Sequence, residues 1–346
     1  MISTITQKVS GVNSGPIQAA ADLLRRGGLV AFPTETVYGL GANALDAAAV
    51  GRIFAAKGRP PTNPIIVHVA DALMIDRVAE LRRLPPLRSE LIAKLAASFW
   101  PGPLTLVLPK HANVPDIVTA GGPTVAVRVP AHPIAQALLK EVQLPIAAPS
   151  ANRSSELSPT TAEHVRQALG GRIDMILDGG PCPGGIESTV LDVMTDPPRL
   201  LRPGLITIDQ IESLIGPVQR FAPTVETHGA DASRSALPSP GLLPRHYSPR
   251  TPVEIADDDG RARIAELAAS GLRVGWLTWP AAPRVGEAGR ETLPRDPAAY
   301  SAGLYAALHN LDALHLDRIV VARPPDGDEW LAIRDRLQRA SGDPRK

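Results

Sequence analysis

Cations and small polar side chains that stand where regular segments stop are the residues of this chain best suited to chemistry. Lys57 and Arg59 flank Gly58 at the end of a predicted helix, and a glycine turn allows both cations to aim into one cleft. Such a pair can clamp an anion. It can equally complement the negative end of the helix and remain solvated, where it contributes under about 1 kcal/mol. The spacing alone leaves both interpretations open.

A further cation lies on the strand-like segment 124–129. Its alternation places Thr124 and Arg128 on one face and three valines on the other, so the valine face is predicted to be core. Arg128 must then reach solvent or meet a carboxylate or a phosphate. His68 is the only polar side chain of segment 65–70, and it is either a satisfied core or rim histidine or a ligand contact.

Small hydroxyl and amide groups accompany these cations. They occur at 149–152 (PSAN), directly after an apolar segment, and at 188–189 (ST), directly before one. They are either ordinary turn residues or ligand contacts, since ligands of open α/β sheets collect beyond the carboxyl ends of strands. The sequence shows no paired carboxylates, no metal-binding cluster and no nucleophile with an obvious base. The predicted cleft therefore positions and neutralises anions instead of forming covalent intermediates.

Familiar nucleotide motifs are missing or misplaced. The chain has no GxxxxGK[ST] motif, and the GxGxxA pattern at 39–44 lies six residues beyond the strand predicted at 29–33. We therefore expect a tight glycine turn at 39–44 and no dinucleotide site. The single Cys182 cannot form an internal disulfide or a cysteine-based zinc site, so a loop thiol in a reducing cytoplasm is expected.

Strands and helices alternate in the part of the chain that carries these residues. Helices are predicted at 16–26, 47–57 with Asp46 as N-cap, 87–99, 133–141, and from an N-cap at Ser158 to about Leu169. Strands are predicted at 29–33, 65–70, 104–109, 124–129 and 145–149, and in RIDMILD, STVLDV and PRLLRP further on. The pattern predicts an α/β lobe spanning 1–216.

A second, smaller domain is expected after a linker. Residues 217–250 contain six prolines and almost no apolar periodicity, which is typical of a linker. Beyond it, VEIAD, RVGWLTW and RIVVARP are predicted strands, with helices near 260–269, 298–313 and 328–340. This alternation predicts a parallel α/β domain over 251–346.

Composition limits the classes of function. The 346 residues suggest two domains, and 44% hydrophobic with 21% charged residues is ordinary for a folded chain. The net charge is +1, with 19 basic and 18 acidic residues up to Glu212 and 17 of each beyond it. Aromatics are 3%, so stable nucleic-acid binding through a basic surplus or stacking is not expected. No run approaches a membrane span, and the first residues lack an export signal, so we expect a cytoplasmic protein without membrane contact.

A set of spaced motifs makes the chain resemble the threonylcarbamoyl-AMP synthase family, the YrdC-type enzymes of tRNA modification. The motifs are FPTETVYGLGANA at 32–44, AKGRPPTNPIIVH at 56–68, WPGPLTLVLP at 100–109, TVAVRVPAHP at 124–133, PIAAPSAN at 145–152, DGG at 178–180, ESTV at 187–190 and LLRPG at 200–204. HYSP at 246–249 and the small second domain resemble the long, two-domain branch. The resemblance implies a large YrdC-like lobe with a twisted mixed sheet, a proline-rich linker and a small Rossmann-like parallel α/β domain.

The resemblance also implies a reaction. L-Threonine, bicarbonate and ATP give threonylcarbamoyl-AMP and pyrophosphate, and a separate transferase complex uses the product to modify a tRNA adenosine beside the anticodon. A carbamate, a carboxylate and a triphosphate gather in one site, so cations must offset their repulsion. Mg²⁺ is expected to arrive on the ATP phosphates, because it keeps several waters and seldom needs a full protein cage.

Site residues are carried over by matching position. Lys57 and Arg59 are the expected catalytic residues. The expected ATP contacts are Lys57, Arg59, Asn63, Thr124, Ser150, Asn152, Ser158, Arg202 and Tyr247. The expected threonine contacts are Thr36, His68, Arg128, the Ala148 backbone and Ser188. Arg128 suits the amino-acid carboxylate because a guanidinium matches it bidentately. Because Tyr247 lies in the linker, we hypothesise that residues 217–250 close over the cleft as a lid that excludes water.

Three other functions compete with this one. A carbamoyl-adenylate-forming enzyme of the kind found in hydrogenase maturation would need the cysteine-rich zinc motifs that one cysteine cannot supply. An RNA-binding or ribosome-associated module would use the cleft for a phosphate backbone, against the charge balance. A dehydrogenase would use the pattern at 39–44 to bind NAD.

Overall fold

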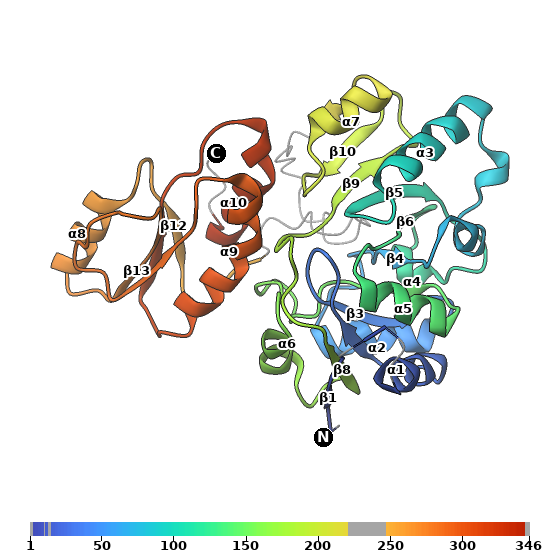
Figure 1. The fold of residues 1–346 in the computed structure, drawn as a ribbon, viewed down its shortest axis with the longest axis horizontal. Helices are drawn as coiled ribbons and strands as arrows, with labels where there is room; N and C mark the ends of the chain where they lie inside the picture. The colour runs from blue at the N-terminus through green and yellow to red at the C-terminus, as the bar shows by residue number, and fades with distance from the viewer. Residues whose placement is uncertain (1–2, 10, 13–14, 221–246, 343–346) are drawn as a thin grey trace.

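The protein forms two α/β units built on separate sheets (Figure 1). A computed structural model describes residues 3–9, 11–12, 15–220 and 247–342. The N-terminal domain holds an 11-stranded mixed sheet and the C-terminal domain a 4-stranded sheet in which every pairing is parallel. This confirms the predicted α/β class, the mixed N-terminal sheet and the small parallel second domain. Most of the proposed lid, 221–246, lies outside the described residues. None of the described helices combines the length and apolarity that a membrane span requires.

The large sheet joins strands that are far apart in the chain. Its order is β1-β8-β2-β3-β7-β4-β6-β5-β9-β10-β11. The strands are β1 (Ile5–Lys8), β2 (Val30–Phe32), β3 (Gly39–Asn43), β4 (Val67–His68), β5 (Leu104–Pro109), β6 (Thr124–Arg128), β7 (Ile146–Ala147), β8 (Met175–Asp178), β9 (Thr189–Asp192), β10 (Arg199–Arg202) and β11 (Gln219–Arg220). Parallel β4 and β6 place His68 directly opposite Arg128. The segments singled out for chemistry therefore meet in the middle of this sheet.

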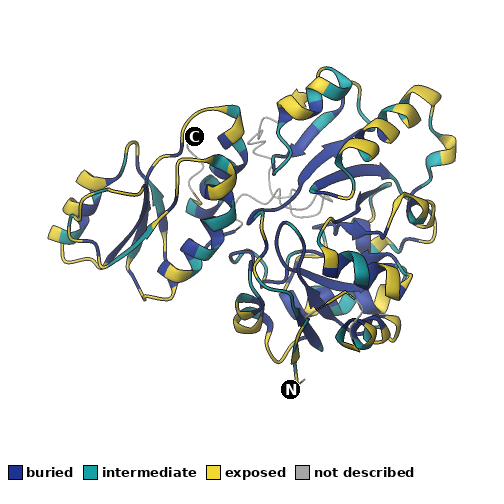
Figure 2. Cartoon of the chain, in the orientation of Figure 1, coloured by how far each residue is buried: buried dark blue, intermediate teal, exposed yellow. Residues whose placement is uncertain are grey.

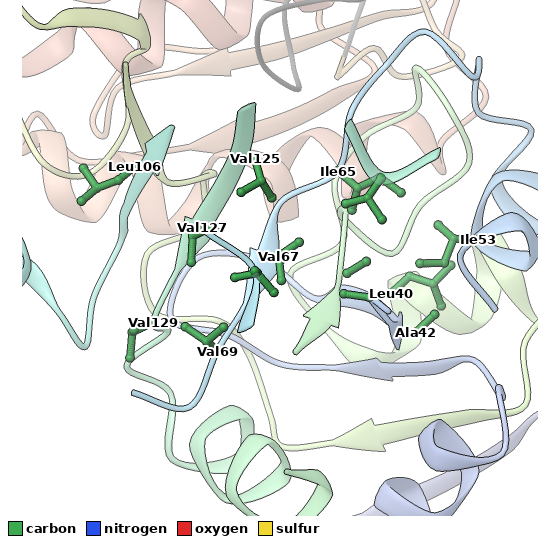
Figure 3. Close-up of a cluster of buried hydrophobic side chains, with 14 of the residues drawn as sticks. Leu40, Ala42, Ile53, Ile65, Val67, Val69, Leu106, Val125, Val127 and Val129 are labelled. Carbon is green, nitrogen blue, oxygen red and sulfur yellow. The ribbon is translucent and has the colours of Figure 1, made fainter. Parts of the chain in front are cut away.

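Helices cover the sheet in two layers. The helices are α1 (Gly15–Arg25), α2 (Ala47–Lys57), α3 (Pro86–Phe99), α4 (Asp116–Thr119), α5 (Pro133–Val142), α6 (Ala162–Leu169) and α7 (Ile208–Ile215), with short 3-10 turns at Ala72–Arg77 and Leu81–Arg83. One apolar cluster packs α1 and α5 against β2 and β8. A larger apolar cluster packs the remaining helices of this domain against the valine face of segment 124–129. Figure 3 shows Val67, Val69, Val127 and Val129 within the larger cluster, as predicted for the valines of β6.

Local sequence signals explain several boundaries. The Asp46 side chain accepts hydrogen bonds from the Ala48 and Ala49 backbone and starts α2, and Gly58 ends the helix in the left-handed region at φ 64°. Both were predicted. The N-cap predicted at Ser158 is wrong: α6 is capped by Thr161, which accepts a hydrogen bond from the His164 backbone. Ser158 instead donates its hydroxyl proton to Glu187.

The glycine-rich segment 39–44 is not the tight turn that we predicted. Residues Gly39–Asn43 form β3, which pairs antiparallel with β2. A Cβ on Gly41 would lie 2.9 Å from both the Ile146 Cγ2 and the Phe32 Cε1 atoms. Glycine is present because the strand runs against packed side chains, a reason that a local pattern does not reveal.

The C-terminal domain consists of four strands and three helices. The strands are β12 (Val253–Ile255), β13 (Val274–Thr278), β14 (Gly289–Thr292) and β15 (Arg318–Val321); the helices are α8 (Arg261–Ala269), α9 (Pro297–Asp312) and α10 (Leu331–Ser341), with a 3-10 turn at Asp328–Trp330 before α10. The sheet order is β12-β15-β13-β14. In Figure 1, α9 and α10 lie on the side facing the N-terminal domain, and α8 lies on the far side.

The two domains share an apolar cluster. Val37, Leu157 and Ile186 of the N-terminal domain belong to the same buried cluster as Tyr305 and Leu308 of α9. Figure 2 shows buried residues continuing from α9 and α10 to the loops of the large domain, while the outer helix faces are exposed. The second domain is thus packed against the first through buried side chains.

Candidate active site

One pocket collects most of the predicted site residues. Its lining comprises Thr34, Thr36, Val37, Gly39, Arg59, Ile66, His68, Arg128, Ala148, Pro149, Ser150, Glu187, Ser188, Arg202 and Tyr247. The structure therefore brings together all five predicted threonine contacts and four of the predicted ATP contacts, Arg59, Ser150, Arg202 and Tyr247. They come from eight separate stretches of chain, so only the folded sheet brings them together.

Strand alternation directs the central side chains into this pocket. In β4 and β6, the residues Val67 and Val127 point into the large core, so their neighbours His68 and Arg128 point to the opposite face. Because β7 runs antiparallel to β4, its carboxyl end lies beside the start of β4. The pocket lining contains the last residues of β4, β6 and β10, which are His68, Arg128 and Arg202.

Arg128 is buried and held on three sides. Its Nη2 lies 2.6 Å from the Glu35 Oε1, its Nη1 donates to the Thr36 hydroxyl at 3.0 Å, and its Nε donates to the Gly102 carbonyl at 3.2 Å. Thr34 fixes this turn, since its hydroxyl donates to the Val37 carbonyl at 2.7 Å. The guanidinium thus meets a carboxylate, one of the two environments expected for it.

Arg59 is a second buried guanidinium in the lining. Its Nε donates to the Asn63 carbonyl at 3.0 Å and its Nη2 to the Pro64 carbonyl at 2.6 Å. Burial, together with the nearby Arg202 charge, lowers the pKa of Arg59 to about 10 although Tyr247 opposes the shift. Arg59 remains charged at neutral pH, in a site where a second cation is close and an anion would be stabilised.

Lys57 does not line this pocket. Its ammonium donates to the Ser150 carbonyl at 2.6 Å and to the Asn152 carbonyl, both in the loop after β7. Burial, and then the charge of Arg59, lower the pKa of Lys57 well below its usual value. The glycine turn therefore sends Arg59 to the pocket and Lys57 to the backbone of the loop that carries Ser150.

Ser188 and Arg202 form the opposite wall. Arg202 donates from Nε to the Ser188 carbonyl at 3.0 Å and from Nη2 to the Ser188 hydroxyl at 3.1 Å. The same hydroxyl is 2.8 Å from the Thr105 hydroxyl. The Ser188 hydroxyl is thus held between Thr105 and Arg202.

His68 contributes a neutral imidazole. Burial, assisted by the Arg128 charge, lowers its pKa to about 3. Its Nδ1 has no hydrogen-bond partner among the described residues. A buried polar atom in that state suits a ligand group.

Besides Lys57, four predicted ATP contacts lie outside the lining: Asn63, Thr124, Asn152 and Ser158. Thr124 begins the strand that Arg128 ends, so about 13 Å separates them. Asn152 donates its side-chain amide to the Arg153 and Glu156 carbonyls. Both side-chain atoms of Asn63 are buried without a partner among the described residues, which leaves that amide available to a ligand.

Two carboxylates were not anticipated from the sequence. Glu35 pairs with Arg128, and Glu187 lies in the lining itself. Each adjoins a predicted threonine contact, Thr36 or Ser188. That adjacency was the available signal in the sequence. Within the described residues, no three His, Cys, Asp or Glu side chains are grouped to hold a metal.

Comparisons with known proteins decide the family. Residues 22–204 match the family described as telomere recombination (Sua5, YciO and YrdC), and residues 206–342 match the C-terminal domain of threonylcarbamoyl-AMP synthase. The threonylcarbamoyl-AMP synthase of Bacillus subtilis is 45% identical over 98% of this chain and 96% of its own. That of Pyrococcus abyssi is 43% identical over 94% of each.

The chain belongs to the threonylcarbamoyl-AMP synthase family. The crystal structure of Pyrococcus abyssi Sua5 complexed with L-threonine agrees with this, at 41% identity and a TM-score of 0.86 over 99% of this chain and 98% of that one. The family's activity makes this synthase an enzyme of the nucleotidyltransferase class. The family resemblance seen in the motifs and the predicted two-domain branch are thereby confirmed.

Proposed function

We propose that this synthase joins L-threonine, bicarbonate and ATP into threonylcarbamoyl-AMP and pyrophosphate within the pocket of Arg59, Arg128 and Arg202. The observation that carries the proposal is that three buried guanidiniums line one pocket together with small hydroxyls. Guanidiniums match carboxylates and phosphates, and they retain their charge when buried.

The chemistry needs this concentration of positive charge. The amine of threonine must first become a carbamate, with release of water from bicarbonate. A carbamate oxygen then attacks the α-phosphorus of ATP, and pyrophosphate leaves. Two anions approach each other in that step, so groups fixed beforehand around the reacting atoms lower the barrier more than mobile ions do.

Threonine is placed beside β4 and β6 in this proposal. Arg128 binds its carboxylate, and Ser188 and the Ala148 backbone hold its polar groups. His68 and Thr36 lie on the same side of the lining and suit its hydroxyl. The neutral imidazole of His68 can donate or accept there without adding charge.

ATP occupies the remaining wall. Arg59 and Arg202 face its phosphates, with Ser150 and Tyr247 beside them. Asn63 offers a buried amide that has no hydrogen-bond partner among the described residues. We keep Thr124, Asn152 and Ser158 as further contacts in the proposal, and Lys57 as a catalytic residue that acts by holding the Ser150 loop.

The part of the chain that the structure describes provides no metal cage, so we propose that Mg²⁺ enters on the ATP phosphates. The protein's own cations neutralise the carboxylate and the phosphate oxygens that the ion leaves free. The product then passes to a transferase complex for the modification of tRNA beside the anticodon, in the cytoplasm. We further propose the domain division 1–216, 217–250 and 251–346, with the last two segments belonging to the long branch.

Pyrophosphate release tests the function directly. The full chain is assayed with ATP, and threonine, bicarbonate or Mg²⁺ is omitted in turn. Each omission should abolish release. Release that continues without threonine contradicts the proposal, and salt-sensitive RNA binding without threonine-dependent release would favour an RNA-binding module. Arg153→Ala is a matched control, since this exposed arginine pairs only loosely with Glu156, at 4.0 Å, and is not in the lining.

A further inference from the structure

A buried ion pair joins the last helix of the C-terminal domain to the pocket. Arg336 of α10 is 1% exposed, and its Nε donates to the Glu187 Oε2 at 2.7 Å. Tyr305 of α9 donates to the same carboxylate, 3.1 Å from Oε2. On the other side, the Ser158 hydroxyl donates to Oε1. One carboxylate of the N-terminal domain is therefore held mainly by two residues of the second domain.

The position of Glu187 makes this pairing consequential. Among the described residues it is the only carboxylate in the pocket lining, and it directly precedes Ser188. In a buried site, an unpaired carboxylate would repel the carboxylate of threonine and the phosphates of ATP, because like charges interact strongly where water is excluded. With Arg336 beside it, the pair adds no net charge to the wall.

Arg336 also supports the segment that carries Arg202. Its Nη2 donates to the Pro203 carbonyl at 3.0 Å, next to Arg202, and its guanidinium carbon lies 5.0 Å from the centre of the Tyr247 ring. Three pocket-forming segments thus converge on one side chain: the turn before β9, the end of β10 and the residue Tyr247. Asp335 pairs with Nη1 at 2.6 Å and is itself paired with Arg339 at 2.9 Å.

Stability alone does not explain such a pair. Desolvation offsets most of the attraction in a buried ion pair, and apolar replacements of similar volume are often neutral. The domains already pack through Val37, Leu157 and Ile186, which are apolar. The hydrogen-bonded network around Glu187 therefore serves the pocket and not only the stability of the fold.

We propose that Arg336 is a positioning residue of the synthase, which neutralises Glu187 and holds it and the Ser188 and Arg202 walls in the geometry that accepts anionic substrates. The inference rests on the proposed function of the pocket. It gives the C-terminal domain an indirect part in substrate binding, through a side chain that holds residues of the pocket lining.

The test measures binding separately from turnover. Isothermal titration of the full chain with L-threonine, and with a non-hydrolysable ATP analogue and Mg²⁺, gives the two dissociation constants. Arg336→Met should weaken ATP-analogue binding about tenfold or more, the scale of one charge-assisted contact. The double variant Glu187→Gln with Arg336→Met should regain most of that affinity, because the unpaired carboxylate is then gone. Arg336→Lys should be intermediate.

Arg334→Met is the matched control. Arg334 lies in the same helix, but it donates to the Pro325 and Gly327 carbonyls of its own domain. Its substrate affinities should equal those of the wild type. Thermal unfolding of every variant shows whether the fold is retained.

The outcomes separate this proposal from the one it rests on. Unchanged affinity in folded Arg336→Met overturns it, and so does a double variant that binds as poorly as the single one, which would indicate a purely structural role. Arg59→Ala and Arg128→Ala are titrated in parallel. If those two also bind normally, the pocket assignment itself is wrong; if they lose affinity and Arg336→Met does not, only the role of Arg336 fails.

Discussion

The three cations at the end of α2 and in β6 act differently because their partners differ. The charge of Arg128 is neutralised by Glu35, and its side chain lines the pocket. Arg59 donates only to carbonyl oxygens and retains its full charge. Lys57 donates to carbonyls of the loop after β7. A buried guanidinium without a carboxylate partner is the stronger anion site of the two arginines. We therefore assign Arg59 to phosphate and Arg128 to a singly charged carboxylate.

Substituting Arg128 should affect threonine selectively. In Arg128→Ala the amino-acid carboxylate loses a charge-assisted contact worth about 1.5–3 kcal/mol, and Glu35 is left buried beside the site. Threonine affinity should fall at least about tenfold, and affinity for an ATP analogue should change much less. Titration with each ligand measures the two effects. If the variant keeps its threonine affinity, the carboxylate lies elsewhere.

Lys57 and Arg59 should differ in what their loss changes. Arg59→Met removes charge from the pocket, so the KM for ATP should rise, with loss of about 1.5–3 kcal/mol of transition-state stabilisation. Lys57→Met frees the carbonyls of Ser150 and Asn152, so the loop after β7 should loosen. Hydrogen exchange of the backbone amides of residues 150–153 should accelerate in Lys57→Met and remain unchanged in Arg59→Met. Equal protection in both variants would argue that Lys57 acts on substrate directly.

At the scale of elements, β3 depends on the absence of side chains at its glycines. In Gly41→Ala the new Cβ meets the side chains of Ile146 and Phe32. Both are fully buried and packed against neighbouring side chains. We expect overpacking to lower the free energy of unfolding by about 1–3 kcal/mol. Gly51→Ala is the matched control: its Cβ meets only the Ile117 Cδ1 at 3.9 Å, within α2, where alanine is favoured by about 1 kcal/mol. Denaturant unfolding measures both, and a Gly41→Ala as stable as the wild type would contradict the packing argument.

Elements with strong local signals could be predicted, and those fixed by tertiary contacts could not. The segment 104–109 is apolar except for Thr105 and is β5 throughout; Asp46 and Gly58 mark both ends of α2. By contrast, β14 has the sequence GRET, and β1 is mostly exposed, so neither carries an apolar alternation. Both strands were missed because these segments are extended through pairing with a neighbouring strand, and their own residues do not indicate it.

The same limit applies to the site. Arg59, Arg128 and Ser188 were predicted from residue type and motif, and they line one pocket. The direction of Lys57 and the pairing of Glu187 with Arg336 depend on chain segments 93 and 149 residues away, so no local pattern contains them. Motifs identify which residues are used, and the fold determines what each side chain touches.

At the scale of the whole molecule, the domain contact includes a pair of stacked histidines. The rings of His164 in α6 and His309 in α9 are 3.8 Å apart between centres, and the His309 Nε2 lies 3.2 Å from the Ser158 carbonyl. Burial and the partner ring lower the pKa of His164 to about 4, and burial lowers the pKa of His309. The stack holds two neutral rings, since two imidazoliums at that distance would repel.

This stack should make the docked structure sensitive to acid. Both pKa values lie below that of a free histidine, about 6.5, so the open or unfolded chain binds more protons as pH falls from about 6.5 towards 4. Stability contributed by the stack is therefore complete above pH 6.5 and is lost across that interval. Glu163 and Asp312 oppose the shift and Arg250 adds to it, so the slope reflects all of these charges.

Denaturant midpoints measured between pH 7.5 and 4.5 check this prediction. The wild type should lose stability steadily below pH 6.5, and His164→Asn with His309→Asn should show a shallower slope. A residual slope is expected from His68, whose pKa is also lowered by burial. His111→Asn is the control, and its pH dependence of stability should follow that of the wild type. The His111 Nδ1 only accepts a hydrogen bond from the Asn113 backbone. If the double variant is as steep as the wild type, the acid response has another origin, and the stack contributes only packing to the contact between the domains.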